Sequence, residues 1–251
     1  MATYVLVHGG GHGGWCYQPV ARLLRSAGHE VYTPTLTGLG ERSHLLSPAI
    51  DLDLHITDVV QVLHYEDLRD VILVGHSYGG MVITGVADRA AERIGGVVFL
   101  DAANPVNGQS LVDVAGPMIE ATRPMGEVVD GVELVLLPSP EAGRFYGVMD
   151  PDDVAWMADR LTGHPWACFE QPLRLTNETE LWAIPQYHIS CTSTLPTRDP
   201  QLMAKARAAG RLWDIDTGHD LMITEPGAVA DALLQVATDQ EAIVQEKADA
   251  P

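Results

Sequence analysis

The sequence has little positive charge and almost no lysine. Its 251 residues include 15 lysines and arginines against 34 acidic residues, a formal net charge of −19, and the lysines are Lys205 and Lys247 alone. Such an excess of negative charge disfavours nucleic acid and anionic membrane surfaces as partners, because both are themselves negatively charged. We interpret the acidic residues as a solvated surface and expect neither kind of partner.

Cysteines and long apolar runs are also scarce. Cys16, Cys168 and Cys191 are an odd number without metal-ligand spacing, which predicts reduced thiols in a cytoplasmic protein. No stretch approaches the roughly 20 apolar residues of a membrane span, and we expect no cleavable leader before the first strand-like residues at Thr3. No G-x-G-x-x-G motif follows a predicted strand. We therefore expect no metal and no cofactor.

What the sequence does contain is a regular alternation of strand-like and helix-like segments. Apolar, β-favouring stretches predict strands at residues 4–7, 29–33, 71–74, 97–100, 186–191 and 212–215. Amphipathic, helix-compatible segments lie between most of them. Strands that are apolar on both faces and alternate with helices indicate an α/β protein with a mostly parallel six-stranded sheet, flanked by helices on both sides.

The alternation is interrupted between residues 105 and 182. This segment holds many of the prolines, most of the tryptophans and only short helix-like pieces. We interpret residues 1–104 and 183–240 as one α/β core and residues 105–182 as an inserted helical cap. Residues 241–251 are predicted to form a polar C-terminal tail.

A candidate nucleophile lies at the end of the third predicted strand. Residues 71–80 read Val-Ile-Leu-Val-Gly-His-Ser-Tyr-Gly-Gly, in which Gly75 to Gly79 match the G-x-S-x-G motif. Between a strand and a helix, this motif forms a sharp turn that exposes the serine hydroxyl. Glycines two residues before and after the serine remove Cβ atoms that would collide in the turn. The pattern predicts Ser77 as a nucleophile.

A serine hydroxyl needs a base, and His219 is the best placed of the ten histidines. It follows the last predicted strand in the segment Asp216-Thr217-Gly218-His219 and precedes the last helix. In enzymes that carry G-x-S-x-G between a strand and a helix, the three residues follow in the order serine, acid, histidine, so the histidine is expected late in the chain. The oxyanion formed during attack needs backbone N–H donors. We predict these to be Tyr78, directly after the serine, and Gly10, in the glycine-rich loop after the first strand.

The acid that orients the histidine has more than one candidate. A carboxylate must receive the Nδ1 proton of His219. Asp101 ends the apolar strand that follows the serine helix, where a carboxylate needs a partner to offset its desolvation. The segment after residues 186–191 contains no carboxylate before Asp199. We favour Asp101, with Asp199 as the alternative acid and Asp216 as the third candidate.

Several of these segments resemble the α/β-hydrolase superfamily. They are Leu6 to Trp15, with the run His8-Gly9-Gly10-Gly11-His12-Gly13-Gly14, then residues 71–80, 98–101 and 217–219. Within the superfamily the chain is similar to plant methyl esterases, hydroxynitrile lyases and their bacterial esterase relatives. The resemblance implies the α/β-hydrolase fold and the roles given above to Ser77, His219, Gly10 and Tyr78.

The chain departs from these relatives in two ways. They usually have the acid shortly after a Cys-Thr pair, whereas here Cys191-Thr192 is followed by Ser193-Thr194, which directs attention to Asp101, the position that haloalkane dehalogenases of this fold use. Hydroxynitrile lyases need a lysine directly after the histidine, and Asp220 occupies that place. We expect its charge to repel cyanide and to disfavour lyase activity.

The sequence therefore predicts a serine carboxylesterase that cleaves small apolar esters through an acyl-enzyme. The alternatives are a lactone or C–C bond hydrolase, a hydroxynitrile-lyase-like enzyme with the same triad, or a non-catalytic ligand-binding homologue of the α/β-hydrolases. We expect a small-molecule ester as the partner and a monomer or homodimer.

Overall fold

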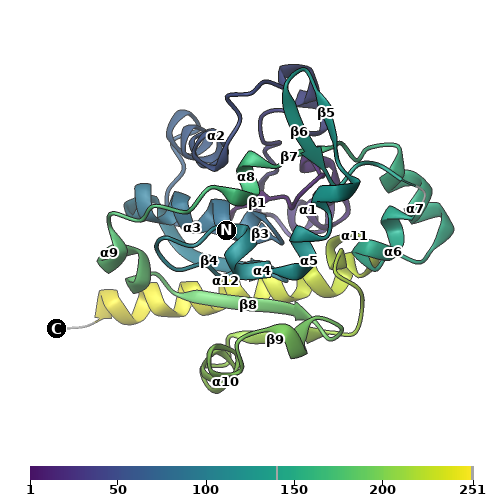
Figure 1. Ribbon diagram of the computed structural model, residues 1–251. Coiled ribbons are helices and arrows are strands. Elements are labelled where there is room, and N and C mark those ends of the chain that lie inside the picture. Colours follow the sequence, from purple (N-terminus) through teal and green to yellow (C-terminus); the bar gives the residue numbers. More distant parts are fainter. Residues whose placement is uncertain (140, 250–251) are drawn as a thin grey trace.

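The six predicted strands form one parallel sheet. The computed structural model, which describes residues 1–139 and 141–249 (Figure 1), has the strand order β2-β1-β3-β4-β8-β9, and every neighbouring pair is parallel. The strands are β1 (Thr3–Val7), β2 (Glu30–Tyr32), β3 (Val71–His76), β4 (Ile94–Leu100), β8 (Gln186–Cys191) and β9 (Leu212–Ile215). The predicted α/β class and six-stranded sheet are confirmed.

Helices cover both faces of this sheet. One apolar core joins the sheet to α2 (Leu52–Tyr65) and α3 (Gly79–Arg89), and the other joins it to α1 (Gln18–Ser26) and α12 (Pro226–Asp249). Successive strand residues enter opposite cores, as the two-residue period of a strand requires; Val5 faces the first core and Leu6 the second. The shorter helices of the core region are α9 (Glu178–Ala183), α10 (Pro200–Ala208) and α11 (Leu221–Thr224).

The segment between β4 and α9, which corresponds to the predicted helical cap, contains three short strands in addition to its helices. It comprises α4 (Leu111–Ala115), α5 (Pro117–Glu120), β5 (Glu127–Val129), β6 (Val132–Val135), α6 (Ala142–Tyr146), α7 (Pro151–Ala158), β7 (His164–Pro165) and α8 (Ala167–Glu170). Strands β5, β6 and β7 form an antiparallel sheet at the top of Figure 1. Asp130 and Gly131, both with positive φ, connect β5 to β6.

The C-terminal segment also differs from the prediction. Residues 241–249 continue helix α12 instead of forming a polar tail. Glu, Gln, Ala and Lys dominate these residues and are strong helix formers, so a polar composition did not end the helix. Residues 250 and 251 of the predicted tail lie outside the described residues.

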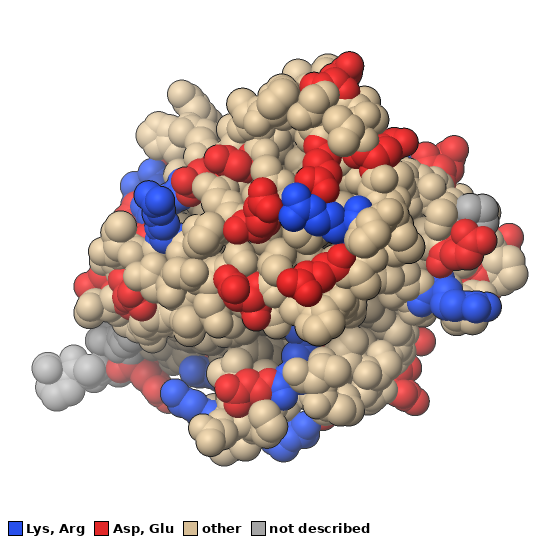
Figure 2. Space-filling model, in the orientation of Figure 1, with Lys and Arg blue, Asp and Glu red and all other residues tan. Residues whose placement is uncertain are grey.

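The surface is acidic without being uniformly so. On the face shown in Figure 2, acidic side chains are spread over most of the surface and basic side chains lie between them. Among the described residues, none of the helices has the length and apolar character needed to cross a membrane.

Candidate active site

Ser77 lies on a strained turn between β3 and α3. Its φ of 52° is in the left-handed region, which costs a residue with a side chain on the order of 1 kcal/mol or more. Backbone N–H groups of Gly80 and Ala103 donate to the Ser77 carbonyl at 3.0 and 2.9 Å. These bonds fix the turn in the conformation that raises the serine side chain above the sheet.

The glycines around Ser77 are required by space. A Cβ atom on Gly75 would lie 2.6 Å from the Gly79 carbonyl oxygen, and one on Gly79 would lie 2.7 Å from the Val7 carbonyl oxygen. A Cβ atom on Gly80 would come within 1.9 Å of the Ala103 carbonyl oxygen. These neighbours are backbone atoms that cannot rotate away, so the predicted need for glycine on both sides of the serine is confirmed.

The structure brings Ser77, His219 and Asp101 together. His219, on the loop between β9 and α11, has its Nε2 2.9 Å from Ser77 Oγ. Its Nδ1 lies 2.5 Å from Asp101 Oδ2. A histidine that donates from Nδ1 to a carboxylate presents the lone pair of Nε2 to the serine proton. The three side chains thus form a continuous chain of hydrogen bonds.

Ser77 and Asp101 leave neighbouring strands at the same level. In the pairing of β3 with β4, His76 lies opposite Leu100, so Ser77 and Asp101 are the next residues on each strand. Asp101 also has a positive φ, 43°. Both chains therefore turn at the carboxyl edge of the parallel sheet, where the loops of α/β proteins build their sites.

The Asp101 carboxylate is buried and fully partnered. Its side chain has no exposed surface, Arg198 lies 2.8 Å from its Oδ1, and the Thr194 hydroxyl donates to the same oxygen. Burial by itself would raise the pKa of Asp101. The hydrogen bond and charge of His219, with Arg198 and Thr194, outweigh burial and hold the pKa well below its usual range. Asp101 is accordingly ionised at neutral pH.

The other two candidate acids have different partners. Asp199 is the N-cap of α10 and accepts hydrogen bonds from the backbone N–H groups of Gln201 and Leu202 at 2.8 and 3.2 Å. Asp216 is exposed and accepts from the Thr192 hydroxyl at 2.7 Å. The structure brings neither carboxylate to His219.

Sequence reasoning missed Thr194 and Arg198. Both follow β8, in the segment where relatives usually have the acid, and both contact the Asp101 carboxylate. The available signal was that this segment offers hydrogen-bond donors, a hydroxyl and a guanidinium, instead of an acid. A buried carboxylate on another strand needs such donors.

Gly10 and Tyr78 line the same cavity as Ser77. The Gly9 carbonyl accepts from His8 Nδ1 at 2.9 Å. Because the C=O and N–H of a trans peptide point in opposite directions, the Gly10 N–H faces away from His8. Within the part of the chain that the structure describes, no hydrogen bond occupies the N–H of Gly10 or of Tyr78. Both are free to donate to a bound oxygen.

The cavity has a volume of about 360 Å³ and is mostly apolar. Cap and core both contribute to its wall. Phe145, Tyr146 and Phe169 supply aromatic surface, and Arg198 and other polar side chains lie on the side of Asp101. Trp156 does not belong to the wall; it packs edge-on against Trp15 at 5.1 Å between ring centroids. Of the aromatic residues between β4 and α9, Phe145 and Tyr146 in α6 and Phe169 in α8 thus line the cavity.

The position of Asp220 corrects one expectation. Its side chain has no exposed surface and lies 2.9 Å from His12 Nε2, below the glycine loop and away from the cavity wall. A charge in that place does not face a departing cyanide. Repulsion of cyanide by Asp220 is therefore not a reason to disfavour lyase activity. Two differences from the lyases are still present in the sequence: no lysine follows His219, and Gly9, not threonine, follows His8.

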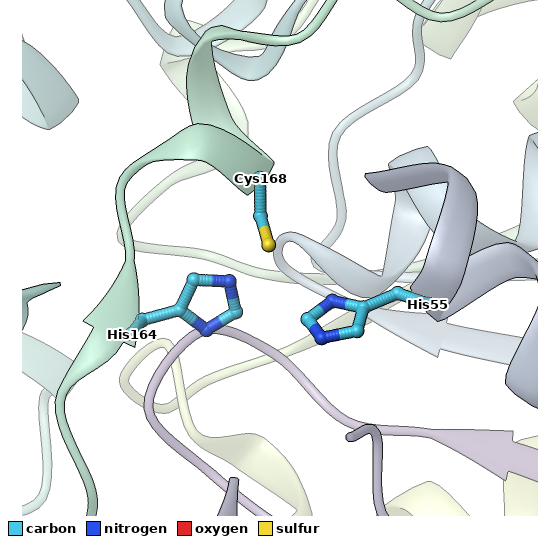
Figure 3. A group of neighbouring side chains, drawn as sticks. All are labelled: His55, His164 and Cys168. Carbon is cyan, nitrogen blue, oxygen red and sulfur yellow. The ribbon is translucent and has the colours of Figure 1, made fainter. Parts of the chain in front are cut away.

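One buried group of side chains combines residue types that can bind a metal. Figure 3 shows His55 from α2, His164 from β7 and Cys168 from α8, whose donor atoms lie within 4.8 Å of one another. His55 Nδ1 bonds the Tyr78 hydroxyl at 3.0 Å, and His164 Nδ1 accepts from the Gly11 N–H at 3.2 Å. The proton of His164 is thus on Nε2, which leaves no lone pair for a metal. We assign the group to hydrogen bonding around Tyr78.

Comparison with known proteins places this geometry in a family. The model of the family described as "Alpha/beta hydrolase family" matches residues 4–232. A carbendazim hydrolyzing esterase of Nocardioides sp. (strain SG-4G) is 39% identical over 93% of this chain and 98% of its own length. Esterase PIR7B of Oryza sativa subsp. japonica is 25% identical over 95% of this chain and 96% of its own.

Solved structures agree on the fold. An extracellular α/β-hydrolase from a Paenibacillus species superposes with a TM-score of 0.77 at 24% identity, covering 94% of this chain and 98% of that one. The methylesterase MES16 from Arabidopsis gives a TM-score of 0.72 at 23% identity, covering 95% and 99%. The resemblance inferred from the sequence motifs is confirmed, and the chain belongs to the α/β hydrolase family.

Proposed function

We propose that this protein is a serine carboxylesterase with Ser77 as nucleophile, His219 as base and Asp101 as acid. The observation that supports it most directly is the chain of hydrogen bonds from Ser77 Oγ through His219 to Asp101, at 2.9 and 2.5 Å. Several relatives are named esterases, including the carbendazim hydrolyzing esterase at 39% identity. Site geometry and relatives thus support the same reaction class.

In the reaction, Ser77 Oγ attacks the ester carbonyl while His219 Nε2 takes the hydroxyl proton. The resulting imidazolium is stabilised by the Asp101 carboxylate. His219 then gives the proton to the leaving alcohol, and the acyl group stays on Ser77. Water, deprotonated by His219, releases the acid and restores the serine.

The negative oxygen of each tetrahedral intermediate lies between the N–H groups of Gly10 and Tyr78. The lack of competing acceptors for these two groups in the described chain supports this role. Removing one such donor typically costs about 3 kcal/mol in activation free energy. Leu136 and Phe169 pack where a Gly10 side chain would project, at 2.8 and 3.1 Å from its Cβ position. Glycine at position 10 thus lets the loop approach the cap.

The substrate is a small, uncharged and largely apolar ester. The cavity of about 360 Å³ has an apolar wall with aromatic surface from Phe145 and Phe169, and sites of this size bury most of a small ligand. Carbendazim is a second candidate substrate, because the relative named for its hydrolysis is 39% identical over nearly the whole chain.

The protein is further proposed to be cytoplasmic. Cys16, Cys168 and Cys191 are all free and buried, as suits a reducing compartment. Fractionation of the cells that produce the protein tests this location.

The function is tested with p-nitrophenyl esters of increasing acyl length, lactones, cyanohydrins and carbendazim. We expect turnover of short esters, which Ser77→Ala abolishes. Turnover of lactones or cyanohydrins without any ester hydrolysis would show that the same triad catalyses a different reaction. An organophosphonate distinguishes a silent binding protein: an activated Ser77 is labelled stoichiometrically, whereas a silent protein is not labelled.

A further inference from the structure

A buried ion pair outside the three catalytic side chains links two loops of the site. His12 Nε2 lies 2.9 Å from Asp220 Oδ2, and neither side chain has exposed surface. The other ring nitrogen, Nδ1, lies 2.8 Å from the Gly10 carbonyl oxygen. Both nitrogens of His12 face acceptors, so both carry protons and the ring is an imidazolium. Burial opposes this charge, but Asp220 and the Gly10 carbonyl raise the pKa of His12.

On one side, this pair holds the glycine loop. The Gly10–Gly11 peptide is bonded at both ends: its carbonyl accepts from His12 and from the Tyr146 hydroxyl at 3.2 Å, and its N–H donates to His164 at 3.2 Å. That peptide directly follows the one whose N–H is the proposed oxyanion donor. A shift of His12 would therefore move the donor itself.

On the other side, the pair holds the loop of His219. Asp220 is the next residue, and its backbone N–H donates to the Tyr146 carbonyl at 2.9 Å. His76 Nε2 donates to the His219 carbonyl at 3.0 Å and lies 3.6 Å from Asp220 Oδ1. The His76 ring is tilted against the His219 ring, with 4.7 Å between centroids. The backbone on both sides of the His219–Asp220 peptide is thus held by buried groups.

Stability alone does not account for a charged pair in this place. Taking two charges out of water is costly, and well-packed apolar residues often replace a buried ion pair without loss of stability. What apolar side chains lack is directional bonding to the Gly10 carbonyl. We therefore attribute the ion pair to the positioning of the two loops and not to stability of the fold.

We propose that His12 and Asp220 are positioning residues which, as one ion pair, set the glycine loop and the His219 loop at a fixed separation. The pair makes the proposed oxyanion donor and the base converge on one carbonyl group. This inference rests on the proposed esterase function, because it assigns the pair to the same site.

The test uses Asp220→Asn, His12→Gln and the double variant, with Asp216→Asn as the matched control. Asp216 is on the same loop but exposed, and an asparagine oxygen still accepts from Thr192. With a p-nitrophenyl ester, we expect each single variant to lower kcat by about 10- to 100-fold, less than loss of an oxyanion donor, and to change KM by less than about threefold. The control keeps the wild-type kcat.

The double variant shows whether the two residues act as one unit. Residues in one hydrogen-bonded pair are non-additive, so the double variant should lose about as much kcat as the worse single one. Affinity for a boronic acid, which forms a tetrahedral adduct with serine, should fall in parallel with kcat. A defect that only destabilises the fold would lower the unfolding temperature without this pattern.

Two results would overturn the inference while leaving the esterase function intact. The first is a folded Asp220→Asn or His12→Gln variant with kcat within twofold of wild type. The second is a double variant whose loss is the product of the single losses. If Asp220→Asn does not fold, His12→Gln, which leaves the acid in place, decides the question. Absence of turnover in wild type and control would instead refute the proposed function.

Discussion

The role proposed for Asp101 leads to a specific prediction for Asp101→Asn. Oδ1 of Asp101 receives donors from Arg198, Thr194 and the Cys191 N–H, whereas the donors to Oδ2 among the described residues are the ring N–H of His219 and the weak Cys191 thiol. An asparagine will therefore turn its carbonyl oxygen toward Arg198 and Thr194 and its NH₂ group toward His219. The amide then donates to Nδ1, and the histidine proton moves to Nε2, facing Ser77.

In that tautomer His219 cannot accept the serine proton. Wrong-tautomer variants of this kind lose on the order of 10⁴ in kcat, which corresponds to about 5.5 kcal/mol of activation free energy. The assay is steady-state hydrolysis of p-nitrophenyl acetate at neutral pH, where we expect this loss with little change in KM.

The control is Asp199→Asn, the alternative acid. Asp199 caps α10, and asparagine caps a helix as well as aspartate does, so this variant should keep wild-type stability and kcat. Asp101→Asn activity within about tenfold of wild type would refute the assigned tautomer and with it the acid. A large loss in Asp199→Asn with activity retained in Asp101→Asn would give the role to Asp199.

Three further predictions follow from the fold. Ser77→Gly should be more stable than Ser77→Ala by about 1 kcal/mol, measured by urea unfolding, because the φ of 52° strains any side chain at position 77. Gly80→Ala should lose about 1–3 kcal/mol, since its Cβ meets the Ala103 carbonyl at 1.9 Å, whereas Gly227→Ala, with open space around it, should be neutral or slightly stabilising. The pKa of Asp101 is lower in the folded protein than in the unfolded chain, where it is about 3.9, so the ionised carboxylate stabilises the fold at pH values above about 3.9. Stability measured by unfolding at a series of pH values should therefore fall below about pH 4, and fall less in Asp101→Asn; equal slopes would contradict the assigned pKa direction.

The parts of the fold that local patterns determine could be predicted from the sequence. Strand β3 begins with four apolar residues and ends at Gly75-His76, directly before Ser77, so its place in a parallel sheet and the turn after it follow from residues 71–80 alone. The position of Asp101 followed from the same logic, since β4 is apolar until its last residue and then meets a carboxylate.

The secondary structure of the cap was harder to predict, because its short helices and strands show no clear hydrophobic periodicity. The hairpin between β5 and β6 nevertheless had a recognisable turn, Asp130-Gly131 between valines, and this pair favours a two-residue hairpin loop. The pairing of His12 with Asp220 had no such local signal. These residues are 208 positions apart, and only the close approach of the glycine loop and the His219 loop in the folded chain makes them partners.

Because the proposed nucleophile and the proposed acid directly follow the adjoining strands β3 and β4, residues 192–198 do not have to supply an acid. In that stretch the hydroxyl of Thr194 and the guanidinium of Arg198 contact the Asp101 carboxylate, while Ser193 and Thr197 border the cavity. Randomising Ser193 and Thr197 would therefore reshape the substrate cavity at positions that take no direct part in the hydrogen bonds from Ser77 through His219 to Asp101.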